Sequence, residues 1–142
     1  MSELPPCDAF VDCRWVTGSQ KFRVTDPYDD ALIAEVTDSN EALVDAAVEA
    51  AARAFPGWKR RPGPERGRLL GQLAARMLSA ERRLAELCTR ENGKPLKESI
   101  AEVRYAASFL AWFAGEAERS YGETIPATNP TQRLTVIREP IG

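Results

Sequence analysis

Histidine is absent from this 142-residue sequence. It is the side chain that most often acts as a general acid or base near neutral pH, and it belongs to the Ser-His and Cys-His nucleophile pairs and to helical zinc motifs. Its absence excludes those classes of active site. Any chemistry must therefore come from carboxylates, Lys, Tyr, Cys or a cofactor.

Cysteine is scarce as well. Cys7, Cys13 and Cys88 are an odd number and include no Cys-x-x-Cys pair, so the pattern predicts reduced thiols in a cytoplasmic protein rather than disulfides or metal ligands. Cys88 lies beside Leu84 and Leu87 on an apolar helix stripe, where we expect a buried core thiol. Neither Cys7 nor Cys13 has basic residues grouped near it in the sequence that would convert its thiol to a nucleophilic thiolate.

Long apolar runs and an excess of one charge are also missing. No stretch reaches about 18 apolar residues and the N-terminus lacks a signal pattern, so we expect neither a membrane protein nor a secreted one. Lys and Arg number 19 against 21 Asp and Glu, a net charge of −2, which argues against a nucleic-acid partner. The composition, 44% hydrophobic and 28% charged, is that of a soluble globular protein.

What is present divides into strands, helices and a last strand. Residues 9–36 contain small apolar clusters separated by turn residues, which predicts short β-strands. Residues 38–120 have helical periodicity and predict three helices. Residues 133–138 alternate like a half-exposed edge strand. The expected fold class is therefore α/β.

Start and stop signals set the expected bounds of the three helices. A capping box, a proline in the first turn and glycine or proline stop residues each mark a helix end. The first helix is expected from Asp38 to Pro56-Gly57, the second from Gly63-Pro64 to Asn92-Gly93, and the third from about Leu96 to about Ser120.

The third helix has two apolar faces. One is formed by Ile100, Val103, Ala107, Leu110, Ala114 and Ala117. The other is formed by Tyr105, Phe109 and Trp112, and no charged residue lies between Tyr105 and Ala114. Since a surface helix needs only one apolar stripe, we expect the aromatic face to contact a further part of the protein or to line a ligand channel.

Two groups of residues could suggest phosphate binding. Gly63, Gly67 and Gly71 fit neither the dinucleotide fingerprint nor the P-loop, and no strand leads into them. The basic residues at 59–61, with Arg66 and Arg68, lack glycines at motif spacing, so we interpret them as a solvated loop between helices. The residues by themselves indicate no catalytic, cofactor-binding or metal site.

Several motifs occur in a familiar order along almost the whole chain. They are DAAVEAAARAFPGW at residues 45–58, ENGKPLKE at 91–98, YGETIP at 121–126 and REPIG at 138–142. Together they resemble the N-terminal portion of the aldehyde dehydrogenase superfamily. The segment YAASFLAWFA at 105–114 is most similar to the succinate-semialdehyde dehydrogenase branch, which also handles glutarate semialdehyde.

The resemblance implies an enzyme that oxidises a semialdehyde to the acid with NAD or NADP, through a cysteine thiolate and a glutamate that activates water. In the family those residues come later in the chain, so no catalytic or cofactor residue is carried onto this one. Residues 1–142 are then expected to be an N-terminal fragment, with the Rossmann core and catalytic domain largely absent, and to be inactive alone.

The resemblance also assigns two surfaces. The helix at 97–120 borders the family's substrate tunnel, so Tyr105, Phe109 and Trp112 are expected to form its wall. The strand at 133–138 corresponds to the oligomer-forming sheet. The implied partners are the remainder of the dehydrogenase chain, further copies in a homo-oligomer, and a small-molecule aldehyde.

Two alternatives to a plain fragment stay open. One is half of a split dehydrogenase whose other part is encoded separately. The other is a free-standing helical binding or scaffold protein that covers its aromatic face by self-association. The sequence also departs from the family pattern at two turns, with Cys13 where glycine is common and Asp29-Asp30 where Gly-Glu is common, and at both turns we expect a positive φ.

Overall fold

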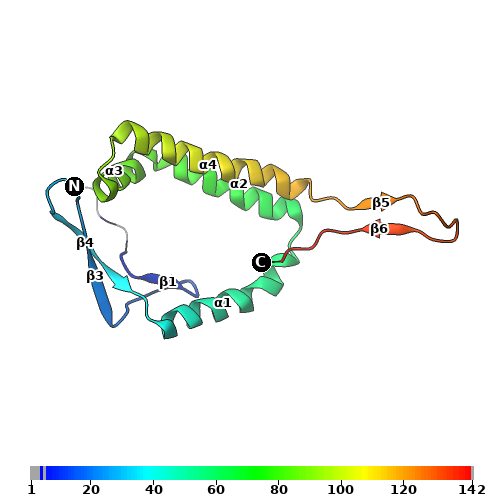
Figure 1. The fold of residues 1–142 in the computed structure, drawn as a ribbon, viewed down its shortest axis with the longest axis horizontal. Coiled ribbons are helices and arrows are strands. Elements are labelled where there is room, and N and C mark those ends of the chain that lie inside the picture. Colours follow the sequence, from blue (N-terminus) through cyan, green and yellow to red (C-terminus); the bar gives the residue numbers. More distant parts are fainter. Residues whose placement is uncertain (1–3, 5, 142) are drawn as a thin grey trace.

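The structure is a computed structural model that describes residue 4 and residues 6–141. Residues 1–3, 5 and 142, which belong to the expected fragment 1–142, lie outside the described residues. Four strands come first, followed by four helices and a final pair of strands (Figure 1). The elements are β1 (Ala9–Val11), β2 (Arg14–Val16), β3 (Gln20–Thr25), β4 (Leu32–Asp38), α1 (Glu41–Lys59), α2 (Gly63–Ser79), α3 (Glu81–Asn92), α4 (Leu96–Glu118), β5 (Glu123–Ile125) and β6 (Leu134–Val136).

The strands form three antiparallel hairpins, β1–β2, β3–β4 and β5–β6. The turn of the first consists of Asp12 and Cys13 at φ of 50° and 61°, the sign pattern of the type I′ turn that matches strand twist. Asp30, in the turn between β3 and β4, has a φ of 58°. The positive φ expected at these two turns is therefore confirmed.

The prediction of three helices is wrong, because the expected second helix is broken into α2 and α3 at Ala80. No glycine or proline marks the break. The Ser79 hydroxyl donates to the Arg76 carbonyl at 2.8 Å, and the Ala80 N–H donates to both Arg76 and Met77. This tightened last turn ends α2, since a serine side chain competes with the helical hydrogen-bond ladder.

The bounds of the first helix also differ from the expectation. Asn40 is the N-cap instead of Asp38, and its side chain accepts a hydrogen bond from the Leu43 N–H at 3.0 Å. Pro56 lies inside α1, which continues to Lys59. Pro56 has no N–H to donate to the preceding turn, so α1 lacks one backbone hydrogen bond there, but the helix continues for three further residues.

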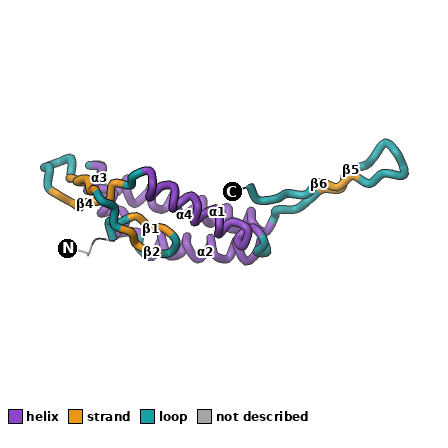
Figure 2. Tube along the Cα trace, turned by 90° about the horizontal axis from the view of Figure 1, so that it is seen from below, coloured by secondary structure: helices purple, strands orange, loops and turns teal. Residues whose placement is uncertain are grey.

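The last part of the chain is a hairpin rather than a lone edge strand. The strand expected at 133–138 is shorter, Leu134–Val136, and pairs with β5, which was not predicted. The hairpin projects beyond the helices (Figure 2). Because each of its strands has a single neighbour, each keeps one unpaired edge.

The helical layer is held by close approach of α2 and α4, which lie side by side (Figure 1). Gly67 of α2 is buried, and a Cβ there would lie 2.5 Å from the Ala114 carbonyl oxygen. A Cβ at Gly63 would lie 2.2 Å from the Ala117 oxygen. The N-terminus of α2 therefore rests on the C-terminus of α4, and the opposite ends of the two helix dipoles face each other.

The chain exposes more surface to solvent in this arrangement than a compact protein of its mass. The accessible surface is 11023 Å², whereas a compact monomer of 15.7 kDa exposes about 7,300 Å². Figure 1 shows α1 apart from α2 and α4, and none of its residues is buried. Within the described part of the chain, no helix has the length and apolar character needed to cross a membrane.

Candidate functional site

The aromatic face of α4 forms an open groove of about 400 Å³, here called the aromatic groove. Its lining residues are Tyr105, Ser108, Phe109, Trp112 and Phe113. Three of these residues were predicted from the sequence, and the structure brings them together on one face. Ser108 and Phe113 were missed, although Phe113 lies four residues after Phe109 and could have been found from helical spacing.

Packing on the opposite side of α4 determines which residues line the groove. Val103 and Ala107 are buried, and Ser99 is fully buried with its hydroxyl 2.8 Å from that of Thr89 on α3. At about 100° per residue, Phe109 lies nearly opposite the Val103 and Ala107 side. The buried face thus fixes the rotation of α4 and leaves the aromatic residues outward.

An ion pair adds to this fixation. The Arg104 guanidinium contacts the Glu81 carboxylate at the start of α3, with Nη2 at 3.2 Å from Oε2. The hydrogen bond that Arg104 donates to the Glu81 carboxylate raises the pKa of Arg104 above its ordinary value, with a further contribution from the charge of the same carboxylate. The link joins α3 to α4 one residue before the groove begins.

The groove is apolar and open. Tyr105 and Phe109 meet edge to face with ring centroids 4.8 Å apart, and the Ser108 hydroxyl donates to the Tyr105 carbonyl at 2.7 Å. Tyr105 is 66% exposed and Trp112 is 65% exposed. Since the lining contains no charged side chain, the groove suits an uncharged, apolar group.

The thiols do not gather near the groove. Cys13 is exposed in the β1–β2 turn, and Cys88 is half-buried with its Sγ 3.8 Å from Glu102 Oε2. The prediction of Cys88 as a buried core thiol is wrong: Cys88 is half-buried, the buried residue of α3 is Ala85, and Leu84 is 37% exposed. Among the described residues, no three potential ligands are grouped as a metal site would require.

The glycines of α2 do not fit a dinucleotide. Backbone atoms of α4 fill the space where a Cβ of Gly63 or Gly67 would lie, whereas the space at the Cβ position of Gly71 is open. The residue before the helix is Pro62 rather than the end of a strand. A phosphate cradle needs free N–H groups at such a helix start, and here α4 lies against it instead.

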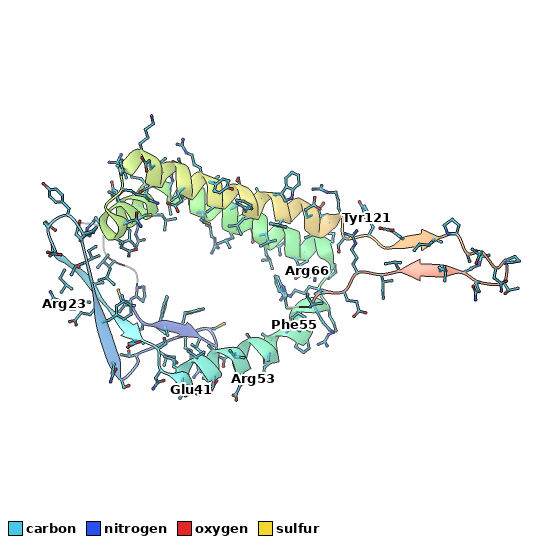
Figure 3. The ribbon with its side chains drawn as sticks, viewed as in Figure 1. Arg23, Glu41, Arg53, Phe55, Arg66 and Tyr121 are labelled. Atoms are coloured by element: carbon cyan, nitrogen blue, oxygen red, sulfur yellow. The ribbon has the colours of Figure 1, made fainter. Side chains whose placement is uncertain are left out.

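The basic residues lie at the junction of α1 and α2, where Figure 3 labels Phe55 and Arg66. Arg61 pairs with Glu65 at 2.9 Å and lies 5.7 Å from the Trp58 ring, while Lys59 lies 5.8 Å from the Phe55 ring. These contacts are those of a surface loop whose cations pair locally.

Comparison with known proteins assigns the family. Residues 15–142 match the family model "Aldehyde dehydrogenase family". The chain is 43% identical over 136 residues to 3-sulfolactaldehyde dehydrogenase of Pseudomonas putida and 40% identical over 136 residues to glutarate-semialdehyde dehydrogenase of the same species. Each alignment covers 94% of this chain and 28% of the relative.

The structural comparison agrees. The crystal structure of succinate-semialdehyde dehydrogenase from Burkholderia pseudomallei superposes with a TM-score of 0.92 and 34% identity, over 96% of this chain and 29% of that one. The expected α/β fold of the family is therefore confirmed. The chain spans less than a third of the length of the curated relatives it matches. It belongs to the aldehyde dehydrogenase family.

Proposed function

We propose that this chain is part of an NAD(P)-dependent aldehyde dehydrogenase that oxidises a semialdehyde, such as succinate semialdehyde, to the corresponding acid. The support comes from the relatives, which are named for 3-sulfolactaldehyde, glutarate semialdehyde and succinate semialdehyde. These are short aldehydes that carry an acidic group at the far end. The proposed substrate class follows from that shared chemistry.

The observation that carries the proposal is the aromatic groove of α4. Its rings are exposed although each would gain free energy on burial, and it lacks a charged lining residue. We assign Tyr105, Phe109 and Trp112 to one wall of the substrate tunnel. They would contact the carbon chain of the substrate and keep water away from it, while the acidic group would be bound by other parts of the enzyme.

The catalytic cysteine, the glutamate and the dinucleotide site are proposed to lie in the parts of the family's fold outside the matched segment. NAD or NADP would accept the hydride there. In this chain Gly63 and Gly67 serve helix packing. Cys13 lies in a turn, and Cys88 lies beside a carboxylate. The 142-residue chain is therefore expected to show neither turnover nor specific dinucleotide binding.

The β5–β6 hairpin is proposed to contribute to a homo-oligomer of the complete enzyme. Its strands have unpaired edges and half-exposed apolar side chains, Ile125, Leu134 and Val136. Another strand could pair with either edge through backbone hydrogen bonds.

A chimera tests the tunnel assignment. This chain replaces the matched segment of P. putida glutarate-semialdehyde dehydrogenase, and the chimera is assayed for NAD(P)H formation from glutarate and succinate semialdehydes. Trp112→Ala is expected to raise KM for the semialdehyde while leaving KM for the dinucleotide unchanged. Leu78→Ala, an exposed apolar position on α2 away from the groove, is the control and should change neither. An active chimera in which Trp112→Ala leaves both KM values unaltered would contradict the assignment.

A further inference from the structure

The charged residues of α1 all lie on one side of the helix. At about 100° per residue they fall within an arc of about 120°, and the C-cap residue falls within the same arc. The set, here called the charged face, consists of Glu41, Asp45, Glu49, Arg53, Lys59 and Arg60. Every member is exposed, so the charged face is in contact with solvent.

The apolar side chains of α1 lie nearly opposite the charged face. Leu43, Ala47 and Ala50 are half-buried, and their positions on the helix are about 150° from the middle of the charged face. Packing within one molecule uses the apolar side of an amphipathic helix. The charged face, on which Figure 3 labels Glu41 and Arg53, is therefore free for a contact between molecules.

The sign of the charge changes along the charged face, whose first half is acidic and whose second half is basic. The helix dipole favours this order only in the first and last turns, so it does not account for Asp45, Glu49 and Arg53 in the middle turns. Asp45 and Arg60 make no ion pair with any described residue. The Arg53 guanidinium lies 3.8 Å from Glu49 and 3.9 Å from Asp12, at the long end of ion-pair distances, and its side chain is 62% exposed. Most of these charges are therefore available to a partner.

A helix face with this order of charges is complementary to an antiparallel copy of itself. A partner with one sign of charge, such as a nucleic acid, would be attracted by one half and repelled by the other. Two copies related by a two-fold axis instead place each acidic half against the basic half of the other copy. With the axis near the middle of α1, Glu41 faces Arg60 of the other copy. Glu49 then faces Arg53, and the small side chain of Ala52, within the same arc, lets the two helices approach closely.

We propose that the charged face of α1 is a homodimer interface, in which two copies of this chain pair antiparallel through ion pairs between their acidic and basic halves. The interface depends neither on the aldehyde chemistry nor on the β5–β6 hairpin. Because exposed ion pairs are individually weak and are screened by salt, the dimer is expected to dissociate at high ionic strength. A tetramer with D2 symmetry contains different two-fold interfaces, so the charged face and the hairpin can each supply one.

Sedimentation equilibrium of the 142-residue chain tests whether the contact is ionic. The molar mass is measured at about 50 mM and at about 1 M sodium chloride, where the Debye length falls to about 3 Å. The high salt concentration is expected to halve the molar mass. Association through the aromatic groove or the hairpin edges involves no charges and would not respond in this way. A molar mass that is the same at both salt concentrations would overturn the proposal.

Charge reversal identifies the residues of the contact. One variant carries Glu41→Lys with Glu49→Lys, and another carries Arg53→Glu with Arg60→Glu. Each variant alone brings like charges together, so its dimer affinity at low salt should fall at least about tenfold. An equimolar mixture places opposite charges against each other again, so a heterodimer is expected. If both variants keep a helical circular dichroism spectrum and their mixture does not associate, the assignment of these residues is wrong.

A matched control reverses two charges on another helix. Arg68→Glu with Arg76→Glu makes the same change at exposed positions of α2 and should leave the salt-sensitive dimer unchanged. An equal loss of dimer in this variant would show that net charge controls association, and this would count against the charged face as the interface. If a variant loses its helical spectrum, the salt response of the unmodified chain decides the outcome.

Discussion

Substitution of Gly67 in α2 changes the stability of the chain through two opposing effects, helix packing and helix propensity. Gly67→Ala adds a Cβ 2.5 Å from the Ala114 oxygen, whereas ordinary contact begins at 3.4 Å. The α2 and α4 backbones must therefore move apart by about 0.9 Å, from 3.4 − 2.5. The opposing atom is backbone and cannot rotate away, so the overpacking cost lies near the upper end of its usual range, about 3 kcal/mol. Alanine is more favourable than glycine inside a helix by about 1 kcal/mol. The net result is a loss of about 2 kcal/mol in the free energy of unfolding.

Gly71, four residues later in α2, is the matched control. A Cβ there meets no atom within 4 Å, so Gly71→Ala gains helix propensity without a clash. The expected change is a stabilisation of about 0.5–1 kcal/mol. Urea titrations of the two variants, followed by far-ultraviolet circular dichroism, give both free energies of unfolding. Changes of the same sign in both variants would refute the argument that close backbone approach at Gly67 holds α2 against α4.

Two further predictions concern the N-terminal hairpins. Cys13→Gly removes the cost of a β-carbon at a φ of 61° and should stabilise the chain by about 0.5–1 kcal/mol in the same titration; a loss of stability would show that the side chain itself is needed. The Asp8 carboxylate accepts a hydrogen bond from the Thr37 hydroxyl at 3.0 Å, which is the main cause of its lowered pKa. Its contribution to stability is present above its unfolded pKa and is lost as pH falls through the lower folded pKa, so the stability difference between wild type and Asp8→Asn should shrink on acidification below about pH 4. A difference that stays constant across this range would contradict the assignment.

Local signals predicted several element ends correctly. Gly63-Pro64 begins α2, and Gly93 ends α3 in the left-handed region at a φ of 76°. Proline at the start of a helix and glycine just after its end act through their own backbone preferences, so the neighbouring sequence is sufficient to read them. The positive φ at Cys13 and Asp30 is of the same kind, because a two-residue hairpin turn or a tight loop imposes it locally.

The features that were predicted wrongly or not at all depend on contacts that local sequence preferences do not reveal. The break at Ala80 depends on a serine hydroxyl that bonds back to the helix, in a stretch where helical periodicity continues on both sides. β5 is a three-residue strand that exists only because β6 returns beside it. Helical periodicity places Cys88 on the apolar stripe of one long helix, whereas in α3 the buried residue is Ala85 and Cys88 is half-buried.

The sequence alone was sufficient to recognise the family, a strand region followed by a helical region and a last strand, and the aromatic face of α4, because motif order, apolar periodicity and the absence of charge between Tyr105 and Ala114 are properties of the chain itself. Contacts between helices determine which face of α4 is buried and which atoms the glycines of α2 meet. Both depend on how closely two helix backbones approach, since Gly63 and Gly67 can serve a ligand or a neighbouring helix, and here they contact α4.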